Sequence, residues 1–482
     1  MPYPLPGIGW GMLTLLCMTA AFAGSAVLDF SQPAVPRAPV RVGVIAGPTG
    51  TPDMPDLTKR FQEFGIRYVR NNDYYDDRLD IEGIFNCGGA TYPSWEGCDP
   101  KDPKNYNWGP SDAMMKVYRD GGFEPMLRLG GEWQNKGRNH DFKGPQTPTQ
   151  ERNWIVAATE VAKRYRHQYT YLNIWTEFPG KQFWDRKESE FAPFWSAAYT
   201  AVKETAPEAR VGGPGFAMMA VKEVQHGRSQ GTAESFLHQL YRDRVRPDWI
   251  GWHMFSNDPQ DLLTTGRLFR DLLEGRGQYA GVPWASDKFF SGVELVLDAL
   301  GTSVRDGREK MERAEAQDLH RGPRGGAIIA ADLVALQGTD TTRAYIYRAS
   351  DPAPQRGMQQ GSWLGLFAGD AAGTPKKRAH AVRLWSVFTS QYPTITALSI
   401  PTGEGPWAAL ATGTTGSAIF VANLTNAPVS LSSKGAVKLE SAKGATAWVL
   451  DDTQEASAAF PLPTGPVTLP ALGVMLIEIP HP

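Results

Sequence analysis

The chain alternates short runs of apolar residues with longer stretches in which apolar residues recur every three or four positions. Short runs bounded by Gly, Pro, Asp or Asn are typical of β-strands, and the longer periodic stretches are typical of helices. The expected strands are residues 40–46, 67–71, 124–129, 171–176, 209–212, 248–254, 282–286 and 343–348. The expected helices follow them, at residues 57–65, 111–120, 150–168, 191–206, 233–243, 260–274, 324–337 and 377–389.

This succession of strands, each followed by a helix, predicts an α/β fold of the (β/α)8 TIM barrel type. The strands are almost continuous apolar runs, as expected of strands buried on both faces of a parallel sheet. A doubly wound open sheet is the alternative, but no G-x-G-x-x-G turn follows the first expected strand. The charged and irregular segment 288–323 is expected to be an insertion after the seventh strand, a helix plus loop over the barrel mouth.

The pattern changes after about residue 392. Segments such as SAIFVANL, GATAWVL and GVMLIEI are separated by turns rich in Gly, Pro, Ser and Thr, with little helical periodicity. This spacing predicts a small β-sandwich. We therefore expect a barrel over residues 26–392, with its first residues as candidates to join the sandwich, and a β-sandwich over residues 393–482. The total of 482 residues agrees, because one hydrophobic core rarely organises so long a chain.

The first 25 residues have the features of a secretory signal peptide. An apolar run from Ile8 to about Ala23 ends in small residues, where cleavage is expected. The usual positive start is missing, since no Lys or Arg precedes Arg37, and the run is short for a membrane span. The sequence thus predicts a secreted or periplasmic protein with no stable membrane insertion after cleavage.

Two cysteines, Cys87 and Cys98, flank the loop-like segment NCGGATYPSWEGC. In an exported protein such a pair suggests one disulfide that pins the loop. Two unrelated free thiols are the alternative. A metal site is disfavoured because no His or third Cys lies nearby at ligand spacing, and no cofactor is expected.

Charge and aromatic content narrow the class of ligand. Lys and Arg total 49 against 51 Asp and Glu, so there is no basic surplus for nucleic-acid binding. The 15 Trp residues are more than a core of this size needs, and exposed indole faces stack well on the apolar faces of sugars. A carbohydrate is the ligand class that this composition favours.

Barrel enzymes carry their working residues at the C-terminal ends of the strands. The fourth expected strand ends in Glu177 and the seventh in Asp287, so the two carboxylates are expected to face each other across the mouth. Cleavage of a glycosidic bond needs such a pair: one carboxyl protonates the departing oxygen, and the other attacks the sugar or activates water. Should Asp287 be a surface ion-pair residue or a cap, Glu294, Glu132 and Asp73 are the next candidates.

Several blocks together resemble glycoside hydrolase family 39, which contains β-xylosidases, α-L-iduronidases and bacterial exopolysaccharide glycosidases. The resemblance covers roughly residues 28–392. VLDFSQP resembles an N-terminal strand that packs on the family's β-sandwich, GIRYVRNNDYYDD its second-strand block, and LNIWTEFPGKQFW its acid/base segment. DWIGWHMFS carries a His where the family has one. The resemblance implies that Glu177 is the general acid/base, that His253 lies near the nucleophile and sugar, and that the mechanism is retaining.

Three positions depart from the family pattern. Thr176 stands where the family has an Asn that binds the 2-hydroxyl of the sugar, Asn72 where it has a His, and Asp287 where it has a Glu nucleophile. Loss of one methylene withdraws a carboxylate by about 1.5 Å, which widens a retaining separation of about 5–5.5 Å towards the inverting range. These departures suggest an unusual sugar, modified or differently configured at C2.

Further substrate contacts are expected from residues near the strand ends. They are the candidate sugar-binding or orienting residues Asp73 and Arg70, and the candidate stacking residues Trp133, Trp252 and Trp363. Each also has a structural interpretation, as a solvated loop acid, an ion pair or a core tryptophan, and His253 could equally be a core histidine.

The sequence therefore predicts a secreted glycoside hydrolase that acts on a polysaccharide or oligosaccharide, with Glu177 and Asp287 as its catalytic pair. A non-catalytic carbohydrate-binding barrel and a transglycosylase of exopolysaccharide processing are the alternatives.

Overall fold

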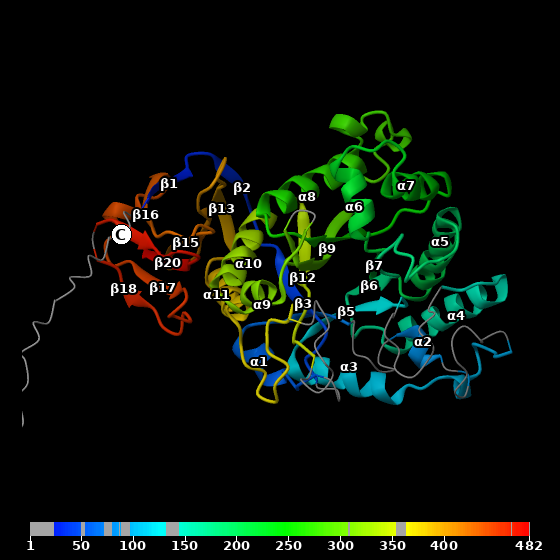
Figure 1. Cartoon of the computed structure of the whole chain (residues 1–482). Helices are drawn as coiled ribbons and strands as arrows, with labels where there is room; N and C mark the ends of the chain where they lie inside the picture. The colour runs from blue at the N-terminus through cyan, green and yellow to red at the C-terminus, as the bar shows by residue number, and fades with distance from the viewer. Residues whose placement is uncertain are drawn as a thin grey trace, which may run out of the picture.

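Eight parallel strands close into a barrel in the computed structural model of the chain, which describes residues 24–49, 54–71, 80–85, 87, 97–131, 144–306, 309–352, 363–463 and 465–481 (Figure 1). Around the barrel the order is β12–β3–β4–β5–β6–β7–β8–β9. The strands are β3 (Arg41–Ile45), β4 (Tyr68–Arg70), β5 (Glu124–Leu129), β6 (Tyr171–Ile174), β7 (Arg210–Gly212), β8 (Trp249–Phe255), β9 (Glu294–Gly301) and β12 (Thr341–Ile346). The predicted (β/α)8 barrel is confirmed.

The helices surround this barrel, and most begin and end within a few residues of the predicted bounds. They are α1 (Thr58–Glu63), α2 (Ile81–Ile84), α3 (Gly109–Gly121), α4 (Pro148–Arg164), α5 (Glu188–Thr205), α6 (Met218–Gln225), α7 (Thr232–Arg242), α8 (Pro259–Glu274), α9 (Arg313–Arg321), α10 (Pro323–Leu336) and α11 (Lys377–Gln391). Local chemistry sets their ends. In α8 the Asp258 side chain accepts a hydrogen bond from the backbone N–H of Gln260, and Gly275 ends the helix at φ 62°.

The seventh strand lies elsewhere than predicted. Residues 282–286 form no strand: η3 (Pro283–Ala285) is a short 3₁₀ turn, and its Trp284 is buried, donating its indole N–H to the Leu272 carbonyl oxygen of α8 at 2.9 Å. The strand between β8 and β12 is β9, within the segment expected to be an insertion. The acids Glu294 and Asp298 interrupt its apolar run and hid it from the hydrophobic pattern.

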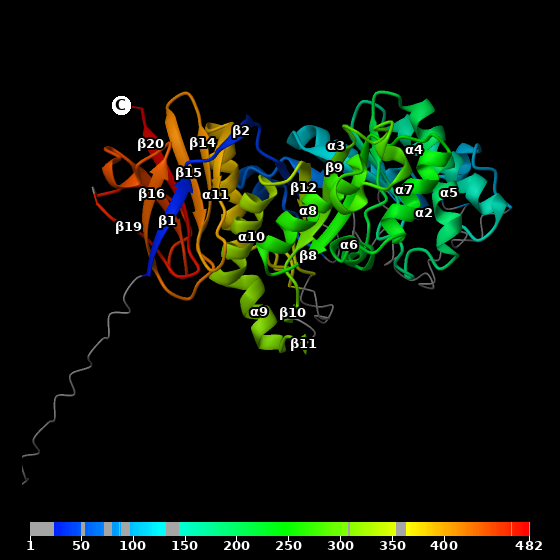
Figure 2. The ribbon, with the colours of Figure 1, turned by 90° about the horizontal axis from the view of Figure 1, so that it is seen from above.

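The remainder of the expected insertion is smaller than predicted. It consists of a short hairpin, β10 (Arg305–Asp306) with β11 (Glu309–Lys310), and of helix α9. Figure 2 shows the hairpin and α9 projecting together from one side of the molecule, next to α10.

The second unit is a β-sandwich, as predicted. Its larger sheet has the order β18–β17–β20–β15–β14–β13–β2 and its smaller sheet the order β1–β16–β19. The strands are β1 (Gly24–Phe30), β2 (Pro33–Arg37), β13 (Thr394–Ser399), β14 (Trp407–Thr412), β15 (Gly416–Ala422), β16 (Val429–Gly435), β17 (Thr446–Leu450), β18 (Phe460–Pro461), β19 (Val467–Leu469) and β20 (Val474–Pro480). The N-terminal strands β1 and β2 pair with β16 and β13, so both ends of the described chain build this unit.

Helices α10 and α11 join the two units. They lie between the barrel and the sandwich in Figures 1 and 2, and α10 is apolar and buried nearly all round because it contacts α8, α11, β14 and β15. Trp385 of α11 packs edge-on against Phe420 of β15, with ring centroids 5.0 Å apart. The hydrophobic core is therefore continuous from the barrel helices into the larger sheet of the sandwich.

The expected disulfide is present: Cys87 and Cys98 are bonded, with Cα atoms 5.8 Å apart. The segment expected to be a signal peptide falls outside the described residues, apart from its last two positions. Among the residues that the structure describes, no helix is both long and apolar enough to cross a membrane.

Candidate active site

Glu177 follows β6 at the C-terminal end of the barrel strands, in an unusual backbone conformation. Its φ is 48° and that of Trp175 is 71°, a left-handed region that residues with a side chain seldom adopt. Such conformations cost about 1–3 kcal/mol each and persist where the surroundings impose them. Here Trp175 is fully buried among the rings of Trp154, Trp184 and Phe194, at centroid distances of 5.6, 5.8 and 5.6 Å. The packing thus fixes the direction in which Glu177 leaves the strand.

The barrel brings two further titratable side chains to Glu177. His253 of β8 lies with Nδ1 3.4 Å from Glu177 Oε1. Its other nitrogen, Nε2, lies 3.6 Å from Oδ2 of Asp298, which comes from the middle of β9. The imidazole thus contacts one carboxylate at each nitrogen. The two contact distances and the width of the ring together limit the separation of the two carboxylates to about 9 Å, which is compatible with both a retaining and an inverting mechanism.

These three side chains differ in their exposure. The Glu177 side chain is 31% exposed, whereas those of His253 and Asp298 are 4% and 0% exposed. Asp298 fits because two neighbouring residues are glycines: a Cβ on Gly215 or Gly251 would lie 2.5 or 2.8 Å from its oxygens. The site therefore presents one carboxyl group at its surface and holds a second beneath it.

Arg70, at the end of β4, neutralises the buried carboxylate. Its Nη2 lies 3.2 Å from Asp298 Oδ2, and it also donates hydrogen bonds to Asn173 Oδ1 at 2.7 Å and to Thr176 Oγ1 at 3.1 Å. The hypothesis that Arg70 orients a carboxylate inside the barrel agrees with this position. Thr176 is buried beside it, with its hydroxyl oxygen directed at the guanidinium.

The charges of the site favour a protonated His253. Burial on its own would lower the pKa of His253, but the Asp298 and Glu177 carboxylates more than compensate and raise it to about 9. At neutral pH the imidazole is therefore a cation, able to donate a hydrogen bond from each nitrogen.

Asp287 is not part of this cluster, and its prediction as the partner of Glu177 is wrong. It follows η3 on the surface and accepts hydrogen bonds from the Tyr241 hydroxyl at 3.2 Å and from Arg244 at 3.3 Å. Tyr241 lies in the last turn of α7 and Arg244 in the segment that leads from α7 into β8, so Asp287 lies at the N-terminal end of the strands, opposite Glu177. The cause is the misplaced seventh strand; the surface ion-pair interpretation of Asp287 is the one observed, with Arg244 as its partner.

Glu294, the first alternative partner, also lies at the wrong end. It begins β9, where it accepts a hydrogen bond from the Tyr171 hydroxyl at 2.6 Å and pairs with Arg210 at 2.5 Å. The predicted site residues Asn72, Asp73 and Trp133, and the alternative Glu132, lie outside the described residues.

Trp252 and Trp363 are not placed as sugar-stacking residues. Trp252 is fully buried and stacks on Phe269 of α8 at 5.4 Å, because it alternates with the inward-facing His253 along β8. Trp363 is 1% exposed and packs in a small apolar cluster with Met311 and Leu319. Both predictions are corrected in favour of the core interpretation.

Asp298 is the residue that sequence reasoning missed. The signal was a single acid inside the apolar run ELVLDALG. An ionisable side chain is rarely fully buried unless it is paired, so an acid in the middle of a central strand indicates a partner inside the barrel. The pairing with Arg70, about 230 positions earlier in the sequence, becomes visible only in the closed barrel.

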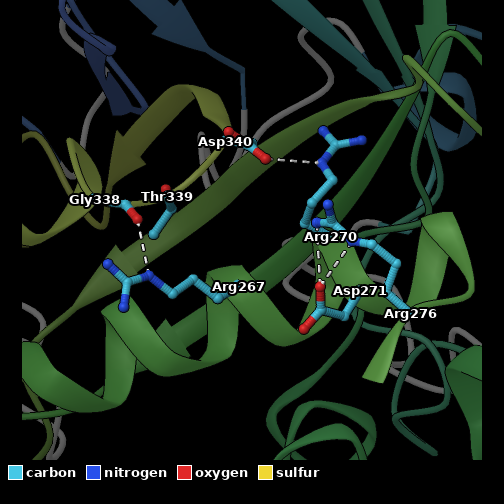
Figure 3. Close-up of a pocket in the computed structure, with 7 residues that line it drawn as sticks. All are labelled: Arg267, Arg270, Asp271, Arg276, Gly338, Thr339 and Asp340. Carbon is cyan, nitrogen blue, oxygen red and sulfur yellow. Dashed lines mark hydrogen bonds and ion pairs between the residues drawn. The ribbon is translucent and has the colours of Figure 1, made fainter. Parts of the chain in front are cut away.

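A pocket of about 320 Å³ lies away from this cluster (Figure 3). It is lined by the end of α8, by Arg276 and by residues 338–340, which directly precede β12, so it opens near the N-terminal end of the strands. Arg270 pairs with Asp340 at 3.3 Å, and Arg267 donates to the Gly338 carbonyl oxygen at 3.0 Å. These contacts hold α8 to the segment before β12, and the lining charges largely neutralise one another.

Comparison with known proteins locates the fold within one group of enzymes. No profile of a known protein family and no curated protein matches the sequence. Several solved structures, in contrast, resemble the chain over nearly its whole length. A glucosidase from Croceicoccus marinus is 18% identical over 95% of this chain and 100% of its own, with a TM-score of 0.66.

Two family 39 glycoside hydrolases are similarly close. A β-xylosidase from Caulobacter crescentus is 16% identical over 95% of this chain and 100% of its own, with a TM-score of 0.62. An enzyme from Xanthomonas axonopodis pv. citri is 15% identical over 95% of this chain and 98% of its own, also with a TM-score of 0.62. At such identities the likeness concerns the fold. The chain has the fold of the family 39 glycoside hydrolases, as its sequence blocks predicted.

Proposed function

We propose that the protein is a glycoside hydrolase that cleaves O-glycosidic bonds of a polysaccharide or oligosaccharide, with Glu177 as its general acid/base. The observation that carries the proposal is the arrangement of Glu177, His253 and Asp298 at the C-terminal end of the barrel, where barrel enzymes perform their chemistry. The structural neighbours are themselves glycosidases, which supports a carbohydrate substrate.

Asp298 takes the partner role in place of Asp287. It is the strand-seven carboxylate, and it lies across His253 from Glu177. Two roles are open to it: attack on the anomeric carbon, or a fixed negative charge that stabilises the positive transition state. The resemblance to family 39 implies the first role and a retaining mechanism.

The identity of the sugar is expected to be unusual. Thr176 directs its hydroxyl oxygen at Arg70, and it has no amide to offer the 2-hydroxyl of a sugar. We therefore propose a substrate that is modified or differently configured at C2. We also propose that the protein acts outside the cytoplasm, which the disulfide between Cys87 and Cys98 supports.

The proposal is tested with Glu177→Gln, Asp298→Asn and Asp287→Asn on a panel of bacterial polysaccharides, with new reducing ends as the readout. We expect the first two variants to lose about 10²–10⁴-fold in kcat, since each removes a charge or proton from the reaction. Asp287→Asn is the matched control and keeps full activity.

Three results would contradict parts of this proposal. A wild-type protein that binds glycan but releases neither reducing ends nor transfer products is a non-catalytic carbohydrate-binding barrel. Transfer products without hydrolysis indicate a transglycosylase. Full activity of Asp298→Asn removes Asp298 from the catalytic pair while leaving the enzyme class intact.

A further inference from the structure

We infer that His253 is a positioning residue that passes a proton to and from Glu177, with Asp298 stabilising the charged imidazole from its other side. This relay, Asp298–His253–Glu177, rests on the proposed glycosidase function. It explains how one exposed carboxyl group is supplied with protons from inside the barrel.

The first support is the way in which the three groups are connected. The two ring nitrogens of His253 face different carboxylates, Nδ1 towards Glu177 Oε1 at 3.4 Å and Nε2 towards Asp298 Oδ2 at 3.6 Å. The other oxygen of Glu177, Oε2, accepts a weak hydrogen bond from the exposed Gln182 at 3.4 Å. Glu177 therefore has an inner oxygen that contacts the imidazole and an outer oxygen on the open side.

The second support is the charge around His253. The groups that face it are Glu177 after β6 and Asp298 on β9, and Asp298 in turn pairs with Arg70 on β4. The two carboxylates stabilise the cationic ring, and Arg70 prevents the buried Asp298 from being an unpaired anion. The two carboxylates therefore keep His253 in its charged form, whereas burial alone would lower its pKa and favour the neutral ring.

The proton transfers balance in both directions. At rest Glu177 is a carboxylate and His253 is charged. As the glycosidic C–O bond breaks, the Nδ1 proton of His253 moves to Glu177, and Glu177 passes a proton to the departing oxygen. His253 is then neutral and keeps its Nε2 proton towards Asp298. When water attacks, Glu177 takes its proton and returns one to Nδ1, and the resting state is restored.

The relay has a consequence for the pH profile. A glycosidase acid that works alone is usually tuned to a pKa of about 6–7. If the charged form of His253 is required, the basic limb of kcat/KM lies near the pKa of His253, which its two carboxylate neighbours raise to about 9. His253→Gln keeps a hydrogen-bond donor but has no proton to transfer, so its basic limb is expected at lower pH, with kcat reduced more than KM is changed.

A direct measurement tests the relay independently of activity. In protein with ¹⁵N-labelled histidine, the resonance that disappears in His253→Gln is titrated in the wild type and in Asp298→Asn. We expect titration near pH 9 in the wild type and a downward shift in Asp298→Asn, because a carboxylate that stabilises the charged ring is lost. His238→Gln, on the exposed face of α7, is the control and should leave both the titration and the activity unchanged.

Two outcomes would overturn the relay. One is a His253 that titrates near its ordinary value of about 6.5. The other is a basic limb of kcat/KM that is the same in the wild type and in His253→Gln. If no glycan is cleaved at all, the proposed function fails, and the titration still decides whether the two carboxylates hold His253 in its charged form.

Discussion

Removing Arg70 should destabilise the barrel more than removing both members of its ion pair. Arg70 and Asp298 are both 0% exposed and lie 3.2 Å apart. Arg70→Met leaves the Asp298 charge buried without its partner, a change that typically costs about 3–5 kcal/mol. The double variant Arg70→Met/Asp298→Leu replaces both charges by apolar groups, which is often neutral or stabilising. The double variant should therefore be closer to the wild type in stability than either single variant.

The assay is urea unfolding of all four proteins at pH 7, followed by tryptophan fluorescence, with the barrel and sandwich transitions fitted separately. The matched control is Arg166→Met, which breaks the exposed pair with Glu208 at 2.7 Å and should cost no more than about 1 kcal/mol. The reasoning is refuted if the costs of Arg70→Met and Asp298→Leu add to within about 0.5 kcal/mol in the double variant, because independent sites behave in this way.

Three more predictions concern the core, the disulfide and acid stability. Trp252→Phe should cost about 1–2 kcal/mol of stability and leave KM unchanged, because this ring packs against α8. A severalfold rise in KM would show instead that Trp252 contributes to sugar binding. Cys87→Ser/Cys98→Ser should lose about 2–3 kcal/mol in urea unfolding, as expected for a short closed loop, and an unchanged midpoint would contradict this. Burial lowers the pKa of His320 to about 3, so its contribution to stability is complete above about pH 6.5 and is lost as the pH falls towards 3. His320→Gln should flatten the loss of stability between pH 7 and 4, and an unchanged slope would rule this out.

Most of the fold could be predicted because its signals are local. Helix ends such as Asp258 and Gly275 are marked by capping chemistry, and seven of the eight expected barrel strands overlap those observed. Strand β9 was missed because its two acids make a buried strand resemble a charged insertion. The segment VPWAS resembles a strand because it is apolar, but its Trp284 anchors a short turn against α8. Local hydrophobicity reports burial, and burial alone does not distinguish a strand from an anchored turn.

The candidate site, too, could be predicted only in part from local signals. Glu177 was found from sequence because it directly follows a strand, and strand ends form the mouth of any such barrel. Its partners could not be found in this way. Asp298 is stable in the middle of β9 because Arg70 compensates its charge and because Gly215 and Gly251 leave it room. Those four residues come from four different parts of the barrel, and they meet only when it closes.

By itself, then, the sequence determined the barrel, the sandwich and the position of Glu177, since each follows from periodicity and turn chemistry over a few residues. The tertiary structure decided which carboxylate accompanies Glu177, that Trp252 and Trp363 belong to the core, and that Asp287 lies at the opposite end of the barrel. The physical reason is that the burial and pairing of a charge depend on residues distant in the chain, and no local pattern records them.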